Sequence, residues 1–151
     1  MWCNHLVNKL FSLEEINGHG TCPTYLFRWT LFRLGDYACY LHHFVGDDWS
    51  RDFHDHPKRF VSIGLKGSYV EESPAYAVGA RVFTAPWVRT FPAEHKHRLR
   101  LRLGSDCWTL VFVGRKTREW GFWHGTRFTT YFIPWRQYVA DANLVEKVKS
   151  C

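Results

Sequence analysis

The sequence has no C-x-x-C pair, and its odd number of cysteines does not suit a framework of disulfides. The five cysteines stand at positions 3, 22, 39, 107 and 151. The first residues lack the basic start and the apolar stretch of a signal peptide. We therefore expect free thiols in a reducing cytoplasm, with Cys39 and Cys107 acting as small buried hydrophobic residues.

Long apolar runs, linkers and repeats are also missing. Without an apolar run long enough to span a bilayer, we expect no membrane partner. Without a stretch rich in proline, glycine or serine, the simplest prediction is one domain over residues 1–151. Within it we expect an N-terminal extension over 1–24, a barrel over 25–138 and a C-terminal tail or helix over 139–151.

Aromatic side chains, in contrast, are abundant: eight Trp, seven Tyr and twelve Phe make up 18% of the residues. The total of 46% hydrophobic residues is enough to fill a core and excludes a disordered chain. So many aromatic rings favour strands and an aromatic-walled cavity over a helical bundle. The formal net charge of +6 favours an anionic partner, which could be a phosphate, a carboxylate or nucleic acid.

Alternating apolar and polar residues predict many short strands, with turns at Gly35-Asp36 and at Lys66-Gly67. Close spacing of these strands predicts an all-β antiparallel barrel or jelly roll. The expected strands cover 25–34, 37–45, 60–65, 68–71, 81–84, 88–91, 97–103, 107–113 and 129–138.

Short helices are expected at both ends of the chain. A modest helical period over residues 2–16 is carried by Leu6, Leu10 and Leu13. Asp141 is expected to cap a last helix, and the apolar residues of that helix would be Leu144, Val145 and Val148.

Three histidines form the most informative pattern. His54 and His56 are two residues apart, so on an extended strand both imidazoles point to the same face, while Asp55 points to the other. His97 begins a strict alternation in which it shares a face with leucines. Leucines mark the core side of a strand, so His97 is predicted to point inward, where an imidazole needs a partner. The arginines of that alternation, Arg98, Arg100 and Arg102, would form a solvated outer face, which we favour over a nucleic-acid-binding patch.

These residues resemble the motifs of the cupin superfamily. His54 and His56 match the paired histidines of the first cupin motif, and Gly67 falls at its final glycine. Pro92 and His97 have the P-x-G-x-x-H spacing of the second motif. A narrower resemblance, to small cupin proteins of phages and bacteria, runs from about Arg28 to Tyr138 and includes RWTLF, LHH, RDFHDHP, PAExxHR, WTL and WGF.

The sequence departs from the cupin motifs at three positions. Phe60 or Val61 stands where the glutamate ligand is expected, Glu94 replaces the glycine of the second motif, and Leu101 replaces its asparagine. Three histidines without a carboxylate are similar to the ligand set of cupin thiol dioxygenases, which hold ferrous iron. The resemblance therefore implies a divalent metal ion on His54, His56 and His97, with Fe(II) favoured and Zn, Mn or Ni as alternatives.

Other side chains are candidates for roles around this site. Glu71 shares a strand face with Tyr69; it is a candidate fourth ligand or general base, unless it faces solvent and Glu72 points inward. Asp55 and His43 are candidates for orienting a ligating histidine, although His43 is as well explained as a hydrogen-bonded core residue. Candidate substrate-binding residues are Arg28, Arg59 and His43, and Tyr69 is a candidate acid or base; His5, His42 and His95 are expected at the surface.

Three functions stay open at this point. The first is a metal-dependent cupin enzyme, most plainly a non-haem oxygenase acting on a small anionic molecule. The second is a protein that binds or sequesters a small ligand, such as a nucleotide-derived one, without turnover. The third is a metal-independent sugar-nucleotide isomerase or epimerase using histidine and tyrosine. A homodimer is considered because cupins pair through sheet edges or faces, and a phage protein of this type would act in the host cytoplasm.

Overall fold

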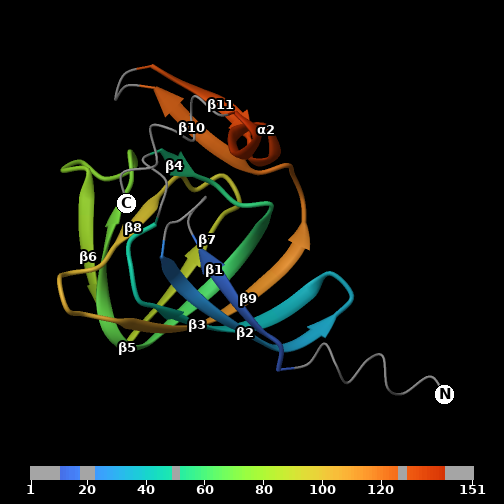
Figure 1. Ribbon diagram of the computed structural model, residues 1–151, viewed down its shortest axis with the longest axis vertical. Helices are drawn as coiled ribbons and strands as arrows, with labels where there is room; N and C mark the ends of the chain where they lie inside the picture. Colours follow the sequence, from blue (N-terminus) through green and yellow to red (C-terminus); the bar gives the residue numbers. More distant parts are fainter. Residues whose placement is uncertain (1–10, 18–22, 49–51, 126–128, 142–151) are drawn as a thin grey trace.

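The computed structural model describes residues 11–17, 23–48, 52–125 and 129–141, and within these ranges the fold is almost entirely antiparallel β-structure. The strands curve around a common interior, and the one described helix lies at one end of it (Figure 1). The elements are β1 (Leu13–Asn17), β2 (Thr24–Leu34), β3 (Tyr37–Phe44), β4 (Phe53–His54), β5 (Lys58–Glu72), β6 (Ala80–Thr84), β7 (Trp87–Phe91), β8 (Arg98–Arg100), β9 (Cys107–Lys116), β10 (Gly121–Gly125), β11 (Thr130–Pro134) and α2 (Trp135–Ala140).

Strand β5 connects the two halves of the larger sheet, whose strand order is β1-β2-β3-β9-β5-β6. The first part of β5 pairs with β7 on one edge and β9 on the other, whereas its last part pairs with β6 and β8. The change occurs near Gly67, which has a φ of +79° and follows a register shift between Gly64 and Lys66. This irregularity lets one long strand bend around the interior, as a jelly roll requires.

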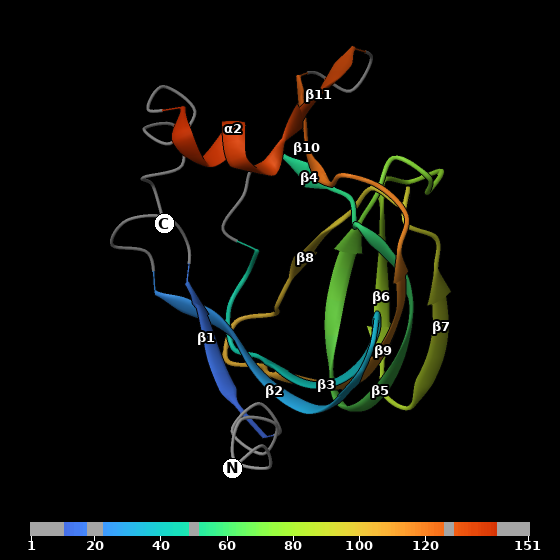
Figure 2. The same cartoon turned by 90° about the vertical axis from the view of Figure 1, so that its right-hand side faces the viewer.

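A smaller sheet, β11-β10-β4, lies with α2 at one end of the larger sheet (Figure 2). The buried Asp55 holds it there, because its carboxylate accepts hydrogen bonds from the Arg118 guanidinium (2.6 Å), the Gly121 N–H (2.9 Å) and the Trp123 indole (3.0 Å). In the described part of the chain, no helix is long and apolar enough to cross a membrane.

Two groups of buried apolar side chains stabilise these sheets. Each large apolar side chain that is fully buried contributes about 1.5–3 kcal/mol. Both cysteines of the larger sheet are buried as the sequence predicted: Cys107 of β9 belongs to the larger of the two groups, and Cys39 of β3 lies outside it. The larger group is formed by Leu26, Phe44, Tyr69 and Cys107, and the smaller one by Phe122 and Ile133 of the smaller sheet with Tyr138 of α2.

The predicted all-β antiparallel jelly roll is confirmed, and so is the hairpin at Gly35-Asp36, which joins β2 to β3. Within the described residues the strand ladders do not close into a complete barrel. The predicted turn at Lys66-Gly67 is wrong, since β5 continues through it. A positive-φ glycine suits a bulge as well as a turn, and only pairing with β9 decides between them.

The predictions for the chain ends were less accurate. Residues 13–16 of the expected N-terminal helix belong to strand β1, because their backbone pairs with the edge of β2; residues 2–10 lie outside the described residues. The expected extended segment 129–138 ends at Pro134, and α2 follows it. Asp141 is the C-cap of α2 rather than the N-cap of a later helix, and residues 142–151 lie outside the described residues.

Replacing Gly67 by alanine is expected to destabilise the fold far more than replacing Gly79. Both glycines have a φ of +79°, so both replacements carry a similar backbone strain of roughly 1–2 kcal/mol. A Cβ on Gly67 would lie 1.9 Å from the Asp106 carbonyl oxygen, whereas a Cβ on Gly79 would meet nothing within 4 Å. Urea denaturation of Gly67→Ala and Gly79→Ala measures the difference. Equal losses in the two variants would show that the close approach at Gly67 is unimportant.

Candidate metal centre and cavity

Backbone pairing brings the three histidines together. His54, at the end of β4, exchanges two hydrogen bonds with His97: its N–H donates to the His97 carbonyl (2.9 Å) and its carbonyl accepts from the His97 N–H (3.0 Å). The His56 N–H donates to the Ala93 carbonyl at 3.0 Å. Two segments far apart in the sequence therefore run side by side, and each contributes imidazoles to one point.

The side chains of His54, His56 and His97 form a compact group of nitrogen atoms. One ring nitrogen from each lies within 4.8 Å of the others, and Nε2 of His56 lies 2.8 Å from Nε2 of His97. Metal–nitrogen bonds of about 2.0–2.1 Å allow one ion to span such a group after small ring rotations. The donor set is thus suited to a divalent metal ion.

Burial keeps these imidazoles neutral, as metal ligands must be. Burial and the neighbouring His97 lower the pKa of both His54 and His56 well below its usual value. Burial also lowers the pKa of His97, although its hydrogen bond with Glu71 acts in the opposite direction. Nitrogen lone pairs are therefore available at neutral pH.

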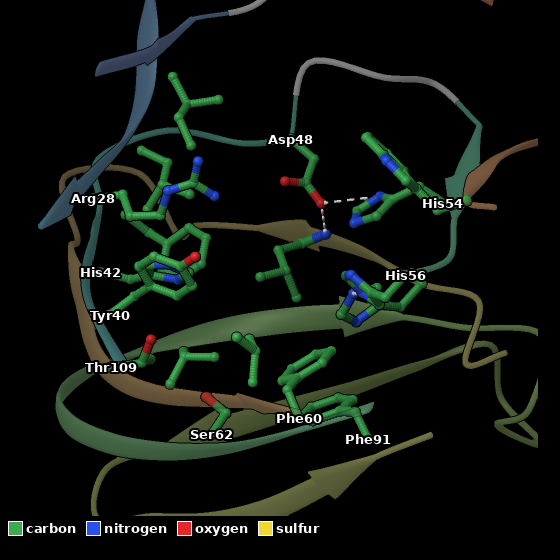
Figure 3. A pocket seen from close by; sticks show the side chains of 18 of the residues that line it. Arg28, Tyr40, His42, Asp48, His54, His56, Phe60, Ser62, Phe91 and Thr109 are labelled. Atoms are coloured by element: carbon green, nitrogen blue, oxygen red, sulfur yellow. Dashed lines mark hydrogen bonds and ion pairs between the residues drawn. The ribbon is translucent and has the colours of Figure 1, made fainter. Parts of the chain in front are cut away.

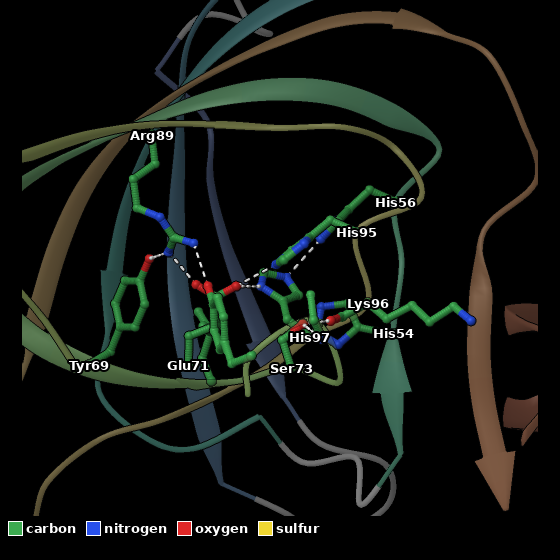
Figure 4. A network of polar contacts seen from close by, with 12 residues as sticks. His54, His56, Tyr69, Glu71, Ser73, Arg89, His95, Lys96 and His97 are labelled. Atoms are coloured by element: carbon green, nitrogen blue, oxygen red, sulfur yellow. Dashed lines mark hydrogen bonds and ion pairs between the residues drawn. The ribbon is translucent and has the colours of Figure 1, made fainter. Parts of the chain in front are cut away.

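Glu71 lies behind His97, away from the other two histidines (Figure 4). Its fully buried carboxylate accepts from His97 Nδ1 at 3.2 Å and from His95 Nε2 at 2.5 Å, and it pairs with Arg89. Burial acts to raise the pKa of Glu71, but hydrogen bonds from His95, His97 and Arg89 outweigh it and hold that pKa below its usual value. An ionised carboxylate only accepts, so Nδ1 of His97 carries the proton and Nε2 presents its lone pair.

A second group of potential ligands, Glu71, His95 and His97, overlaps the first at His97. Its carboxylate already pairs with the Arg89 guanidinium, whose positive charge disfavours a cation beside it. Glu71 and His95 also do not line the cavity, whereas His54, His56 and His97 do. The group of three histidines is therefore the better candidate for a metal ion that must meet a ligand.

The histidines open onto a cavity of about 600 Å³ between the larger sheet and the smaller sheet with α2 (Figure 3). A cavity of this size is typical for a small organic ligand. Aromatic rings form much of its wall, namely Tyr25, Tyr40, Phe44, Phe60, Tyr69, Phe91, Trp120, Phe122 and Trp135.

The backbone architecture is similar to that of several solved proteins. One is the polyketide cyclase RemF from Streptomyces resistomycificus, with a TM-score of 0.60 and 12% identity over 89% of this chain and 91% of that chain. Another is a conserved protein with a double-stranded β-helix domain from Klebsiella pneumoniae subsp. pneumoniae, with a TM-score of 0.50 and 10% identity over 63% of this chain and 76% of that chain. The chain has the cupin fold.

A third similar structure is that of FeII HppE, with a TM-score of 0.54 and 8% identity over 68% of this chain and 57% of that chain. No protein-family model and no curated protein sequence matches the chain. At these identities the likeness shows the cupin fold alone, so the chemistry of the site must be argued from its own residues.

Of Phe60 and Val61, the two residues that the cupin motif offers for the glutamate position, only Phe60 faces the cavity. Phe60 lines the cavity, its ring centroid lies 4.7 Å from that of His56, and it stacks on Phe91 at 4.5 Å. The carboxyl group nearest the histidines on the cavity wall belongs to Asp48, whose Oδ2 lies 3.8 Å from His54 Nδ1 and accepts from the Leu99 N–H at 2.6 Å. Burial raises the pKa of Asp48 to about 7.

Asp48 was not identified from the sequence as a site residue. Its only signal there is a place in the polar loop that precedes His54. The structure shows what holds it: its N–H donates to the Leu99 carbonyl at 3.0 Å, and the neighbouring Asp47 accepts from the Leu101 N–H at 2.7 Å. These bonds attach the loop to strand β8 and direct Asp48 inward.

Several predicted site residues lie elsewhere. Arg59 is exposed and does not line the cavity, because it lies on the outer side of β5. His43 lies on the outer face of β3, where it pairs with Asp106 at 2.9 Å and stacks on Trp108 at 4.0 Å. The Asp55 carboxylate accepts a hydrogen bond from the Gly121 N–H of the smaller sheet, and so does not orient a ligating histidine. The structure therefore does not bring Arg59 or His43 to the cavity, and it gives the Asp55 carboxylate partners other than the three histidines.

Two other predicted residues do reach the cavity but are already partnered. Arg28 lines it, and its guanidinium pairs with Glu14 of strand β1. Tyr69 contributes its ring to the wall, while its hydroxyl accepts from Arg89 at 3.0 Å. Outside the cavity, Arg98 and Arg100 pair with Glu72, so Glu72 is on the outer face and Glu71 on the inner one.

The expectation that His42 and His95 are surface residues is wrong. His95 donates to Glu71, and only 15% of its side chain is exposed. His42 lines the cavity from strand β3, where burial and the nearby Arg28 lower its pKa to about 3. The pairing register of β3 with β2 and β9 decides which of the neighbouring His42 and His43 faces inward. The local sequence Leu-His-His does not distinguish between them.

His42 is expected to make the folded protein sensitive to acid. The unfolded chain takes up a proton at this residue below about pH 6.5, whereas the folded chain does so only near pH 3. The free energy of unfolding should therefore fall as the pH drops below about 6.5, by up to about 1.4 kcal/mol per pH unit from this residue. His42→Leu should flatten that part of the profile in urea titrations at pH 7.5 and 5.0. A variant that loses as much stability as the wild type would contradict the assignment.

Proposed function

We propose that this cupin is a metal-dependent enzyme acting on a small molecule bound in its cavity, and that its activity is that of a non-haem Fe(II) oxygenase. The observation that carries the proposal is the convergence of three neutral imidazoles at the wall of a cavity large enough for a ligand. The likeness to FeII HppE, an iron protein of the same fold, supports iron as the metal.

Bound to these histidines, a divalent ion would supply a positive centre with open positions for an electron-rich oxygen or sulfur atom of the substrate. His54, His56 and His97 would hold the ion, and no carboxylate would reduce its charge from the position of Phe60. Such a site is suited to a thiolate, carboxylate or enolate group, which is the anionic character predicted from the sequence. The cationic side chain of Arg28 is less available for that purpose, since Glu14 already neutralises it.

The surrounding residues position the ligands and exclude water. Glu71 fixes the tautomer of His97, and its negative charge stabilises the proton on Nδ1. His95 and Arg89 complete the partners of this carboxylate, so that it stays ionised although it is buried. Phe60 and Phe91 pack beside the histidines and keep that end of the cavity dry.

Metal content of single variants tests the ligand assignment. His56→Ala should lower the affinity for Fe(II) or Zn²⁺ by more than the roughly 10- to 100-fold that follows from losing a hydrogen-bond partner of a ligand. His124→Ala is the control, because His124 pairs with Asp52 away from the cavity. Elemental analysis and competition with a chelator give the affinities. Loss of metal in His95→Ala but not in His56→Ala would place the ion at Glu71 instead.

The enzyme proposal also needs open positions on the ion. Fe(II)-loaded protein should bind nitric oxide and give the electron paramagnetic resonance spectrum of a ferrous nitrosyl. A stoichiometric ion that gives no such spectrum would favour the alternative of a binding protein with a closed site.

Glu71→Gln is expected to weaken metal binding by about 10- to 100-fold without abolishing it, because His97 loses its ionised partner but keeps Nε2 as a ligand. The matched control is Glu72→Gln on the outer face of the same strand, which should leave metal affinity unchanged. Both variants are compared by chelator competition. A loss in Glu71→Gln as complete as that in His56→Ala would make Glu71 a ligand itself.

A further inference from the structure

A row of polar side chains crosses the cavity wall opposite the histidines (Figure 3). Arg28 of β2 pairs in register with His42 of β3, and His42 pairs in register with Thr109 of β9. All three line the cavity. Residues in register on adjacent strands point to the same face, so the row is fixed by the sheet itself.

Two atoms of this row have no hydrogen-bond partner among the described residues, namely Nε2 of His42 and Oγ1 of Thr109. The Thr109 residue is only 1% exposed, and both atoms are buried. A buried polar atom without a partner destabilises the fold, because its hydrogen bonds to water are not replaced. A wall that carries two such atoms in line, among aromatic rings, has the character of a recognition surface rather than of a core.

The row presents hydrogen-bonding groups without an uncompensated charge. His42 is neutral at physiological pH, since it gains a proton only near pH 3. Arg28 is paired with Glu14. A neutral donor or acceptor on the ligand, such as a hydroxyl or a carbonyl, satisfies His42 and Thr109 without bringing a charge into the aromatic cavity.

We propose that His42 and Thr109 recognise a neutral hydroxyl or carbonyl group at one end of a ring-containing, largely apolar substrate. The other end of that substrate reaches the histidines; this part of the inference rests on the proposed function. Aromatic walls such as Tyr40, Phe44 and Phe60 bind flat rings by stacking, and a volume of about 600 Å³ holds a molecule of two or more fused rings. The row therefore sets the orientation of the substrate, and the histidines meet its reactive end.

Equilibrium dialysis of the full chain with 2-naphthol and 2-methylnaphthalene tests the row, since these probes have the same shape and differ in the hydroxyl. Thr109→Val keeps the shape of the side chain and removes its hydroxyl. We expect this variant to weaken 2-naphthol binding by about 2- to 12-fold, the range of one net hydrogen bond, and to leave the affinity for 2-methylnaphthalene unchanged. His42→Leu should have the same selective effect. Chelator-treated protein is used, so the result does not depend on a metal ion.

Thr30→Val is the matched control. Thr30 is equally buried and its Oγ1 also has no partner among the described residues, but it does not line the cavity. Both threonine variants should raise the melting temperature by roughly 2–4 °C, because each removes a buried hydroxyl without a partner among the described residues. Of the two, only Thr109→Val should alter 2-naphthol binding. Any of three results would overturn the proposal. The first is that Thr109→Val and His42→Leu bind 2-naphthol as tightly as the wild type does. The second is that Thr30→Val loses as much 2-naphthol affinity as Thr109→Val, and the third is that 2-naphthoate binds more tightly than 2-naphthol. None of these outcomes bears on the metal content of the histidines, so failure here is distinct from failure of the proposed function.

Discussion

The backbone hydrogen bonds exchanged by His54 and His97 are the interaction on which the site depends. They join the segment that precedes β5 to the segment that precedes β8, and so they bring two imidazoles of one segment against one of the other. An isolated bridge of this kind is weak by itself, because a net hydrogen bond contributes only about 0.5–1.5 kcal/mol. It is supported on both sides, by Asp48 bonded to Leu99 and by Asp55 bonded to Gly121.

Charge is distributed unevenly around this bridge. On the cavity side, burial keeps His54, His56 and His97 neutral, which is the state that a metal ion needs. Behind His97, the fully buried Glu71 pairs with the partly buried Arg89, and hydrogen bonds from two histidines compensate the cost of removing the carboxylate from water. His97 belongs to both groups of side chains. Its Nε2 faces the other histidines, and its Nδ1 donates to the Glu71 carboxylate.

The cavity wall shows a comparable balance between stability and binding. Strand alternation places aromatic rings and polar groups of β2, β3 and β9 on the same inner face. Apolar rings alone would pack more stably than a row that contains His42 and Thr109, since these two present buried atoms with no partner among the described residues. The proposed substrate would supply those partners, and it would be oriented by them.

By itself, the sequence determined the type of fold and the residue types of the site. Alternation, abundant aromatic rings and the hairpin at Gly35-Asp36 depend on local chemistry, so an antiparallel jelly roll and the candidate trio of His54, His56 and His97 were predictable. Only the tertiary structure decided which other side chains join them. Whether His42 or His43 faces the cavity depends on strand register, Asp48 reaches it through a loop bonded to β8, and His95 meets Glu71 across the fold. Register and long-range backbone pairing are properties of the assembled sheet, because each strand fits either face until its neighbours fix it.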